Sequence, residues 1–301
     1  MVGTARPAHV VAGGTIPAHV NPAGGSAKAA LEALERHPQF DVRLTPPERL
    51  SVALRQAVSA GVPRVLVAGG DGTIASAASV LARTSTALAV LPGGTLNHFA
   101  RDRQIPTDPE EALQVAEHGR VARVDVGYVN DQLFLNTSSV GSYVHFVETR
   151  ERLERQFGYR AASIVAGIRI LSHLRPLRVT LELEDEKRVY QAPMVFIGVG
   201  ERLLSPPKLG RPAGEAGGAL HVVIPRGRHQ ARRFVRTYAR TNQGLAVEAR
   251  PLGLDTALVD RLRLDLPRLT VKVATDGEIR LQRTPLEYRL EREALSVVIP
   301  A

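Results

Sequence analysis

The sequence predicts an α/β domain followed by a second, β-rich domain, and three observations carry this prediction. The chain has 301 residues, about twice the ~150 residues of a typical domain. Up to about residue 120, short strand-like runs alternate with helical stretches, as they do in a doubly wound parallel sheet. From about residue 121 the pattern changes to strand-like pieces joined by short polar turns, which indicates a mainly antiparallel domain.

In the first part, each expected strand is a short β-branched or apolar run that enters a crossover helix. The strands are expected at residues 16–20, 41–45, 64–70 and 87–91. The stretch from Pro47 to Ala60 has apolar residues at helical spacing, and Thr73 to Ala82 is rich in alanine, the best helix former. We therefore expect residues 1–120 to form one α/β domain.

In the second part, strands are expected at residues 123–129, 132–139, 177–184, 194–200, 219–225, 262–266 and 269–274. Two helical candidates, roughly 143–174 and 228–241, interrupt them. The last segment, 284–301, is strand-like and is expected to close one of the two sheets. The second domain is thus expected to span residues 121–285, and the final strand, about 286–301, is a candidate for returning to the first domain.

Composition restricts the chemistry and the partners. The chain contains no cysteine, which excludes disulfides, thiolate metal sites and cysteine nucleophiles. Its net charge of +9 favours anionic partners such as nucleotides, nucleic acid or acidic lipid surfaces. Residues 7–27 carry no formal charge, but their prolines and glycines fit neither a spanning helix nor a secretory signal, so a cytoplasmic location is expected.

The strongest motif is the glycine-rich turn Gly69, Gly70, Asp71, Gly72 and Thr73, which lies between an expected strand and an expected helix. Amides at such a helix start form an anion site that the helix dipole reinforces. Glycines let phosphate oxygens approach closely, and Asp71 offers a carboxylate for a metal, a hydroxyl or a ribose. The alternative is a tight turn in which Asp71 only caps the helix.

A second glycine-rich loop, residues 91–102, follows the next expected strand, and a third, Asn21 to Lys28, follows the first. Loops that leave the carboxyl ends of neighbouring parallel strands meet at the crevice where open α/β sheets bind ligands. Thr95 and Asn97 are candidate contacts to a phosphate or a base, although Thr95 would also suit a simple helix cap. The third loop lacks the pattern of a P-loop and is weak evidence alone.

In the second part, Asp276, Gly277 and Glu278 end an expected strand and project two carboxylates. Such a pair can orient a hydroxyl nucleophile, accept its proton or hold a metal that bridges phosphates. The competing interpretation is an ordinary Asp-Gly hairpin turn with Glu278 in solvent.

Taken in their order along the chain, from the segment at Asn21 to the turn at Asp276, the four motifs resemble the diacylglycerol kinase catalytic-domain family, which includes soluble bacterial lipid kinases and the sphingosine and ceramide kinases. The resemblance implies a nucleotide-binding α/β domain, a β-sandwich, and ATP, Mg2+ and a lipid acceptor that meet in the cleft between them. It implies a catalytic role for Glu278, with Asp276 beside it and Asp71 as the other carboxylate facing the reaction. The nucleotide contacts that we expect are Asn21, Pro22, Ala23, Thr45, Gly69, Gly70, Asp71, Gly72, Thr73, Gly94, Thr95 and Asn97.

The chain departs from the family pattern at one stretch. The family usually carries an Asp-Gly-x-Leu-Asp stretch that helps to bind Mg2+, whereas the matching positions here begin with Gly217 and end with His221. Glu215 and Asp276 are weak substitute candidates for the metal. The segment that ends at Glu201 also lacks the asparagine commonly seen there.

The predicted function is therefore transfer of the ATP γ-phosphoryl group to a hydroxyl of a diacylglycerol-like or sphingoid lipid. The alternatives are a non-catalytic ATP-binding or lipid-binding protein and a small-molecule kinase similar to NAD kinases. Arginines recur every four residues from 228 to 240, as a candidate contact for anionic lipid head groups at the inner membrane surface or as a plain solvated face. Nucleic acid is not an expected partner, because aromatic residues make up only 4% of the chain.

Overall fold

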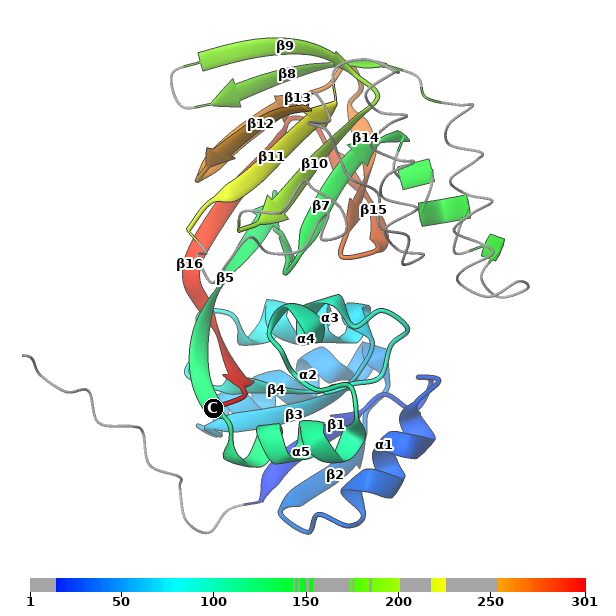
Figure 1. Cartoon of the computed structure of the whole chain (residues 1–301), viewed down its shortest axis with the longest axis vertical. Helices are drawn as coiled ribbons and strands as arrows, with labels where there is room; N and C mark the ends of the chain where they lie inside the picture. The colour runs from blue at the N-terminus through cyan, green and yellow to red at the C-terminus, as the bar shows by residue number, and fades with distance from the viewer. Residues whose placement is uncertain are drawn as a thin grey trace, which may run out of the picture.

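The computed structural model describes residues 15–142, 144–145, 147–149, 152–153, 174, 176–183, 186–200, 218–225 and 254–301. Within these ranges the chain forms two lobes, one above the other in Figure 1. The first lobe is an α/β sheet domain and the second is a mainly antiparallel β domain, which confirms the predicted fold class.

The first lobe is built on four parallel strands in the order β2-β1-β3-β4. Its strands are β1 (Ile16–Val20), β2 (Phe40–Leu44), β3 (Arg64–Gly69) and β4 (Ala87–Pro92), and its helices are α1 (Ala27–Leu34), α2 (Pro47–Ser59), α3 (Asp71–Leu81), α4 (His98–Asp102) and α5 (Pro109–His118). Pro47 begins α2, where its missing N–H costs nothing. The strands and two helices that we predicted here are present, with ends shifted by at most two residues.

Both faces of this sheet are covered, which explains why β3 and β4 are continuous apolar runs. On one face, Val67 packs with Leu54 of α2 and Ile74 of α3. On the other face, Leu66 packs with residues of α1 and α5. The alternation along β3 therefore divides the lobe into two apolar layers around one sheet.

The second lobe contains two sheets that enclose a shared apolar core. Its strands are β6 (Gln132–Phe134), β7 (Thr137–Gly141), β8 (Leu177–Leu183), β9 (Glu186–Ala192), β10 (Met194–Val199), β11 (Leu220–Pro225), β12 (Leu254–Val259), β13 (Arg261–Asp265), β14 (Thr270–Thr275) and β15 (Glu278–Arg283). One sheet has the order β12-β11-β10-β7-β14-β15. Ile197 of this sheet packs with Leu264 and Tyr288 of the other.

Two long strands, β5 (Arg120–Val129) and β16 (Leu286–Ile299), run together from one lobe to the other (Figure 1). They pair antiparallel over almost their whole length, and we call them the interlobe ribbon. At one end β16 pairs with β4, through Val297 and Leu88, and at the other it pairs with β13. The ribbon therefore joins strands of both lobes into one ten-stranded sheet. The domain limits near residues 120 and 285 remain a prediction.

Several elements differ from the sequence prediction, and two predicted helices lie wholly or partly outside the described residues. The strands β9, β12 and β15 were not predicted; β9 and β15 have the polar composition of surface loops, whereas β12 is a short and mostly apolar run. The helical candidate at 228–241 lies outside the described residues, and the one at 143–174 is described only in part, with helical residues before 154. In the part of the chain that the structure describes, no helix has the length and apolar character needed to cross a bilayer.

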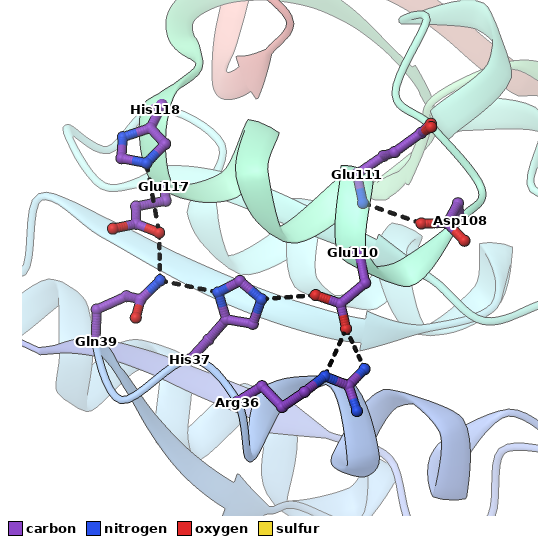
Figure 2. A network of polar contacts seen from close by, with 8 residues as sticks. All are labelled: Arg36, His37, Gln39, Asp108, Glu110, Glu111, Glu117 and His118. Atoms are coloured by element: carbon purple, nitrogen blue, oxygen red, sulfur yellow. Dashed lines mark hydrogen bonds and ion pairs between the residues drawn. The ribbon is translucent and has the colours of Figure 1, made fainter.

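A polar network joins the turn after α1 to α5 (Figure 2). The carboxylate of Glu110 accepts hydrogen bonds from Arg36 Nε at 3.0 Å and from His37 Nε2 at 2.9 Å. Gln39 donates to His37 Nδ1 at 3.1 Å, which leaves Nε2 of that ring as the donor toward Glu110. These hydrogen bonds, the one from His37 first, lower the pKa of Glu110.

We expect Glu110→Gln to lower the melting temperature near neutral pH and to match the wild type in acid. A carboxylate whose pKa is lowered by folding stabilises the folded chain above its ordinary pKa, and this stabilisation is lost as the pH falls through the lowered value. Thermal unfolding measured from pH 3 to 8 checks this. Glu32→Gln, on the exposed face of α1 beside Lys28, is the control; equal melting curves for the two variants would contradict the prediction.

Candidate functional site

The two predicted glycine loops lie in direct contact at the carboxyl ends of β3 and β4. The amide of Gly93 donates to the carbonyl of Gly69 at 2.9 Å. A Cβ placed on Gly94 would lie 2.9 Å from the Cα of Gly70, closer than real Cβ atoms come. Side chains here would separate the two loops, so the glycines keep two backbones within reach of one ligand.

Helix α3 begins at Asp71, directly after the first glycine loop, and its N-terminus points into this region. The residue before it, Gly70, has no side chain, and among the described residues no side chain caps the helix. The amides of its first turn therefore keep their hydrogen-bonding capacity and the positive end of the helix dipole. Thr73 adds a hydroxyl, which accepts from Asn21 Nδ2 at 3.4 Å.

The third loop, after β1, closes another side of the same region. Asn21 accepts the amide of Ala23 at 3.0 Å, and both Pro22 and Ala23 are exposed. Ser26, which precedes α1, donates to the carbonyl of Gly93 at 2.7 Å. A small cavity of about 10 Å³ lies between this loop and the glycine loops, lined by Val20, Asn21, Gly24, Ser26, Ala27, Ala30, Ala68, Gly69, Leu91 and Gly93. The structure thus brings together the three motifs that the sequence analysis singled out.

Thr45 is buried beyond the carboxyl end of β2, and a residue that the sequence analysis missed fixes its side chain. His19 Nδ1 lies 2.9 Å from the Thr45 hydroxyl. Burial, with a smaller contribution from the charge of Arg43, lowers the pKa of His19, so the ring is neutral near pH 7. No motif marks His19, because a lone histidine in a strand has no sequence signal.

In the second glycine loop, Thr95 and Asn97 differ in their surroundings. Thr95 is exposed, whereas Asn97 is buried and has a left-handed backbone with φ of 49°. The Asn97 side chain accepts from the Gly94 amide at 2.8 Å and donates to the Gly94 carbonyl at 2.9 Å. Asn97 therefore shapes the loop, whereas the Thr95 side chain is exposed to solvent.

Glu278 reaches this region from the second lobe. A Cβ placed on Gly72 would overlap its Oε1 atom, so the carboxylate lies against the first turn of α3. Its other oxygen accepts from Arg280 Nη2 at 3.2 Å, and both side chains are about half exposed. The acidic turn of one lobe and the glycine turn of the other therefore share one site, as the sequence analysis expected.

Asp276 lies beside Glu278 but is held quite differently. Its carboxylate accepts three backbone amides, those of Leu135 at 2.6 Å, Asn136 at 2.8 Å and Thr137 at 3.0 Å. Burial, and to a smaller extent the charge of Asp71, raises the pKa of Asp276 to about 6, against the effect of these amides. Since both oxygens are engaged, this carboxylate acts as a brace for the turn that presents Glu278.

The described carboxylates do not form a metal cage. No group of three metal-binding side chains occurs among the residues that the structure describes. Among the described residues, the one hydrogen bond that Asp71 accepts is the distant amide of Phe99, at 3.4 Å, so it suits the usual mode in which one or two carboxylates hold a Mg2+ that nucleotide phosphates share. Asp276 already accepts three amides, so it has less capacity for a metal than Asp71, and its role as a metal ligand stays a prediction.

The stretch that departs from the family pattern is only partly described. Glu201, Glu215 and Gly217 lie outside the described residues, as do the four arginines from 228 to 240. His221 is buried in β11, and Gly218 donates its amide to Asp125 at 2.5 Å. The described half of this stretch is thus a hydrogen-bonded turn.

Comparison with known proteins decides the family. Residues 19–129 match the family model of the diacylglycerol kinase catalytic domain. A protein from Pseudomonas aeruginosa named probable lipid kinase YegS-like is 31% identical over 253 residues, which cover 81% of this chain and 77% of that protein. The chain belongs to the YegS-like lipid kinase family. Membership in this lipid kinase family is consistent with a phosphotransferase.

One further relative matches about half of this YegS-like chain in sequence, and two solved structures share its fold. A protein of the same name from Enterobacter sp. is 35% identical over 153 residues, which cover 49% of this chain and 50% of that protein. Two crystal structures from Bacillus anthracis str. Sterne share the fold. One has a TM-score of 0.73 at 20% identity, covering 95% of this chain and 97% of its own. The other, described as a diacylglycerol kinase, has a TM-score of 0.68 at 19% identity, covering 95% and 96%.

We expect Asp276→Asn to change how the stability of the YegS-like chain depends on pH. An acid whose pKa is raised by folding, here from 3.8 to about 6, stabilises the folded state below its unfolded pKa, and this contribution is lost as the pH rises through the folded value. The wild type should therefore lose unfolding free energy relative to Asp276→Asn between pH 4 and 7, by on the order of a few kcal/mol. Urea unfolding across this range checks it, and a constant difference would contradict it.

Gly72→Ala should separate stability from activity. Alanine favours a helix over glycine by about 1 kcal/mol, so the unfolding free energy should hold or rise. The added Cβ would nevertheless displace the Glu278 carboxylate, so phosphoryl transfer should fall roughly tenfold or more, as misplaced catalytic groups do. Thermal unfolding and turnover measured together check this. Full turnover in a well-folded variant would show that the Gly72 and Glu278 contact has no role.

Proposed function

We propose that this chain is an ATP-dependent lipid kinase that transfers the γ-phosphoryl group to a hydroxyl of a diacylglycerol-like or sphingoid lipid. The observation that carries the proposal is the position of Glu278, whose carboxylate comes from the second lobe and lies at the first turn of α3. A phosphate seated on that turn would be adjacent to an acid able to accept a hydroxyl proton. A nucleotide and an acceptor would thus meet between the lobes.

Nucleotide binding is supported by the loops of the first lobe. The uncapped amides of α3 and the bare backbones at Gly70 and Gly94 suit the closely approaching oxygens of a triphosphate. Asn21 and Thr45 would reach the remainder of the nucleotide, with Pro22, Ala23 and Thr95 at its edges. These roles follow the family resemblance and the convergence of the loops.

The mechanism would be in-line transfer. Glu278 orients the acceptor hydroxyl and takes its proton as the oxygen attacks the γ-phosphorus, while the bond from that phosphorus to the β-γ bridging oxygen breaks and ADP leaves. Asp71 would hold a Mg2+ that arrives with ATP, which when bound would neutralise charge on the phosphate oxygens. The amides of α3 hold the transferring group in line, and Asp276 keeps the Glu278 turn in place. Most of the acceleration would come from such positioning.

The lipid acceptor and the membrane belong to the same proposal. The relatives are named as lipid kinases, and a lipid hydroxyl must reach Glu278 from a bilayer. The net charge of +9 favours peripheral contact of a cytoplasmic protein with an anionic membrane surface.

A non-catalytic ATP-binding or lipid-binding role is the second candidate. The observation that favours it is the absence of the family's acids at Gly217 and His221, together with the engagement of Asp276 by three amides. Such a protein would bind nucleotide without Mg2+-dependent transfer to any lipid. The following experiment separates the two functions.

Purified chain, [γ-32P]ATP and a total lipid extract, with and without Mg2+, should yield a labelled lipid that mass spectrometry can identify. Glu278→Gln should lower its rate of formation by roughly 100-fold or more, the contribution of a general base, without a matching loss of nucleotide binding. Glu287→Gln, an exposed glutamate on β16, is the matched control. Nucleotide binding without any labelled lipid would support the second candidate, and turnover of Glu278→Gln within about threefold of the wild type would remove its catalytic role.

A further inference from the structure

The interlobe ribbon contains an irregularity halfway between the lobes. Its register shifts between Glu291 and Leu295, where β16 bulges away from β5. Within the bulge, Glu293 has a backbone φ of 50°, a left-handed conformation that residues other than glycine rarely adopt. Strained residues of this kind persist only where the surroundings hold them in place. The surroundings of the bulge come from both lobes.

On the side of the first lobe, the bulge is joined to the end of α3. The backbone amide of Arg83 donates to the carbonyl of Ala294 at 2.6 Å. The Arg83 side chain also donates from Nε to Glu291 Oε2 at 2.7 Å. The Arg83 guanidinium also lies 5.5 Å from the ring centre of Tyr128 on β5. Helix α3 has Gly72 in its first turn and Arg83 just past its end, so one rigid helix connects the site to the bulge.

On the side of the second lobe, Arg292 joins the bulge to two loops. Its Nη2 donates to the carbonyl of Gly218 at 2.7 Å and to Asp260 Oδ1 at 2.6 Å. Asp125 of β5 completes the connection, since it accepts the amide of Gly218 at 2.5 Å and that of Glu293 at 2.8 Å. Neighbouring residues of one bulge therefore contact opposite lobes, Glu291 the first and Arg292 the second.

We propose that Arg292 is a positioning residue that locks the second lobe onto the interlobe ribbon and so holds Glu278 at the first turn of α3. The expected effect of Arg292 on catalysis rests on the proposed function, whereas its expected effect on the angle between the lobes does not. The lock acts at a distance, through the bulge and the ribbon, because Glu278 and Gly72 belong to different lobes and their contact depends on the angle between them.

Arg292 also provides a positive charge at the turn for which the family resemblance implies Mg2+. The two described carboxylates nearest to Arg292 are already engaged, Asp125 by two backbone amides and Asp260 by the guanidinium. Asp260 therefore has its charge matched by Arg292, and Asp125 has both oxygens engaged by amides. The proposal therefore includes that, in the described part of this stretch, a side chain of the protein itself and not a metal joins the second lobe to the ribbon.

The arginine's exposure limits what the lock contributes to stability. The side chains of Arg292 and Asp260 are 56% and 45% exposed, and ion pairs in solvent stabilise a fold only slightly. One guanidinium on the ribbon that bonds two groups of the second lobe nevertheless restricts how that lobe is oriented on the ribbon. The expected effect of its loss is consequently a change in geometry and turnover with a small change in unfolding temperature.

Steady-state kinetics of Arg292→Gln test the effect on the reaction. We expect kcat to fall roughly tenfold, as small misplacements of catalytic groups do, while KM for ATP stays within about twofold, because the nucleotide loops belong to one lobe. Arg292→Lys should restore part of kcat. Arg263→Gln, which removes an exposed arginine of β13 away from the bulge, is the control. Unchanged kcat in Arg292→Gln, or an equal loss in Arg263→Gln, would overturn the proposal.

Spin labels test the geometry without any activity. The chain has no cysteine, so Val52→Cys in the first lobe and Leu269→Cys in the second, both exposed, allow a specific label pair. Pulsed electron resonance should give one narrow distance distribution for the labelled protein and a broader or shifted one when Arg292→Gln is added. Identical distributions would overturn the lock. If lipid transfer fails while this change is seen, the proposed function falls and the lock stands.

Thermal unfolding of the nucleotide-free protein tests whether a metal is bound at this turn. Its unfolding temperature should be the same within about 1 °C in EDTA and in excess MgCl2, because a ligand that binds only the folded state would raise it. A loss of several degrees in EDTA for the wild type would show that a metal holds the turn, and this outcome would overturn the metal-free lock.

Discussion

The pairing of β5 with β16 is the constraint on which the site depends. Each lobe contributes only part of the candidate site, the first a set of backbone amides and the second a carboxylate on a turn. The proposed reaction needs both parts, because the amides would hold a phosphate and the carboxylate would accept a proton. Two paired strands that cross between the lobes bring these parts to one place, and β16 continues the pairing to β4 in one lobe and to β13 in the other.

Three carboxylates near this place have three different environments. Asp276 is buried and saturated by amides, Glu278 is half exposed against Gly72, and Asp71 has one long hydrogen bond at the start of a helix. The differences follow from the number of donors that each oxygen meets. A saturated carboxylate serves as a structural brace, whereas one with open lone pairs remains available for a proton or a shared ion.

The glycine loops show how a close approach of backbones becomes a binding site. Strands β3 and β4 are neighbours in a parallel sheet, so their ends lie about one strand spacing apart, roughly 4.8 Å. Only residues without side chains let the loops after them touch, as Gly70 and Gly94 do. Hydrogen bonds from the Gly94 amide to Asn97 and from Ser26 to the Gly93 carbonyl then stabilise the second loop. The same contacts that organise the loops leave the amides of α3 uncovered.

Local patterns in the sequence were enough to determine the two-part fold class, most strands of the first lobe and the four motifs that meet at the site. Periodicity, glycine turns and apolar runs act over a few residues, so they can be recognised without knowing which segments pair. The roles within the site could not be determined in that way. His19 beside Thr45, the amides that saturate Asp276 and the arginine that bridges Gly218 and Asp260 all join residues far apart in the chain. Only the tertiary structure decides which donors reach which oxygens, because that depends on the register of the interlobe ribbon and the packing of both lobes around it.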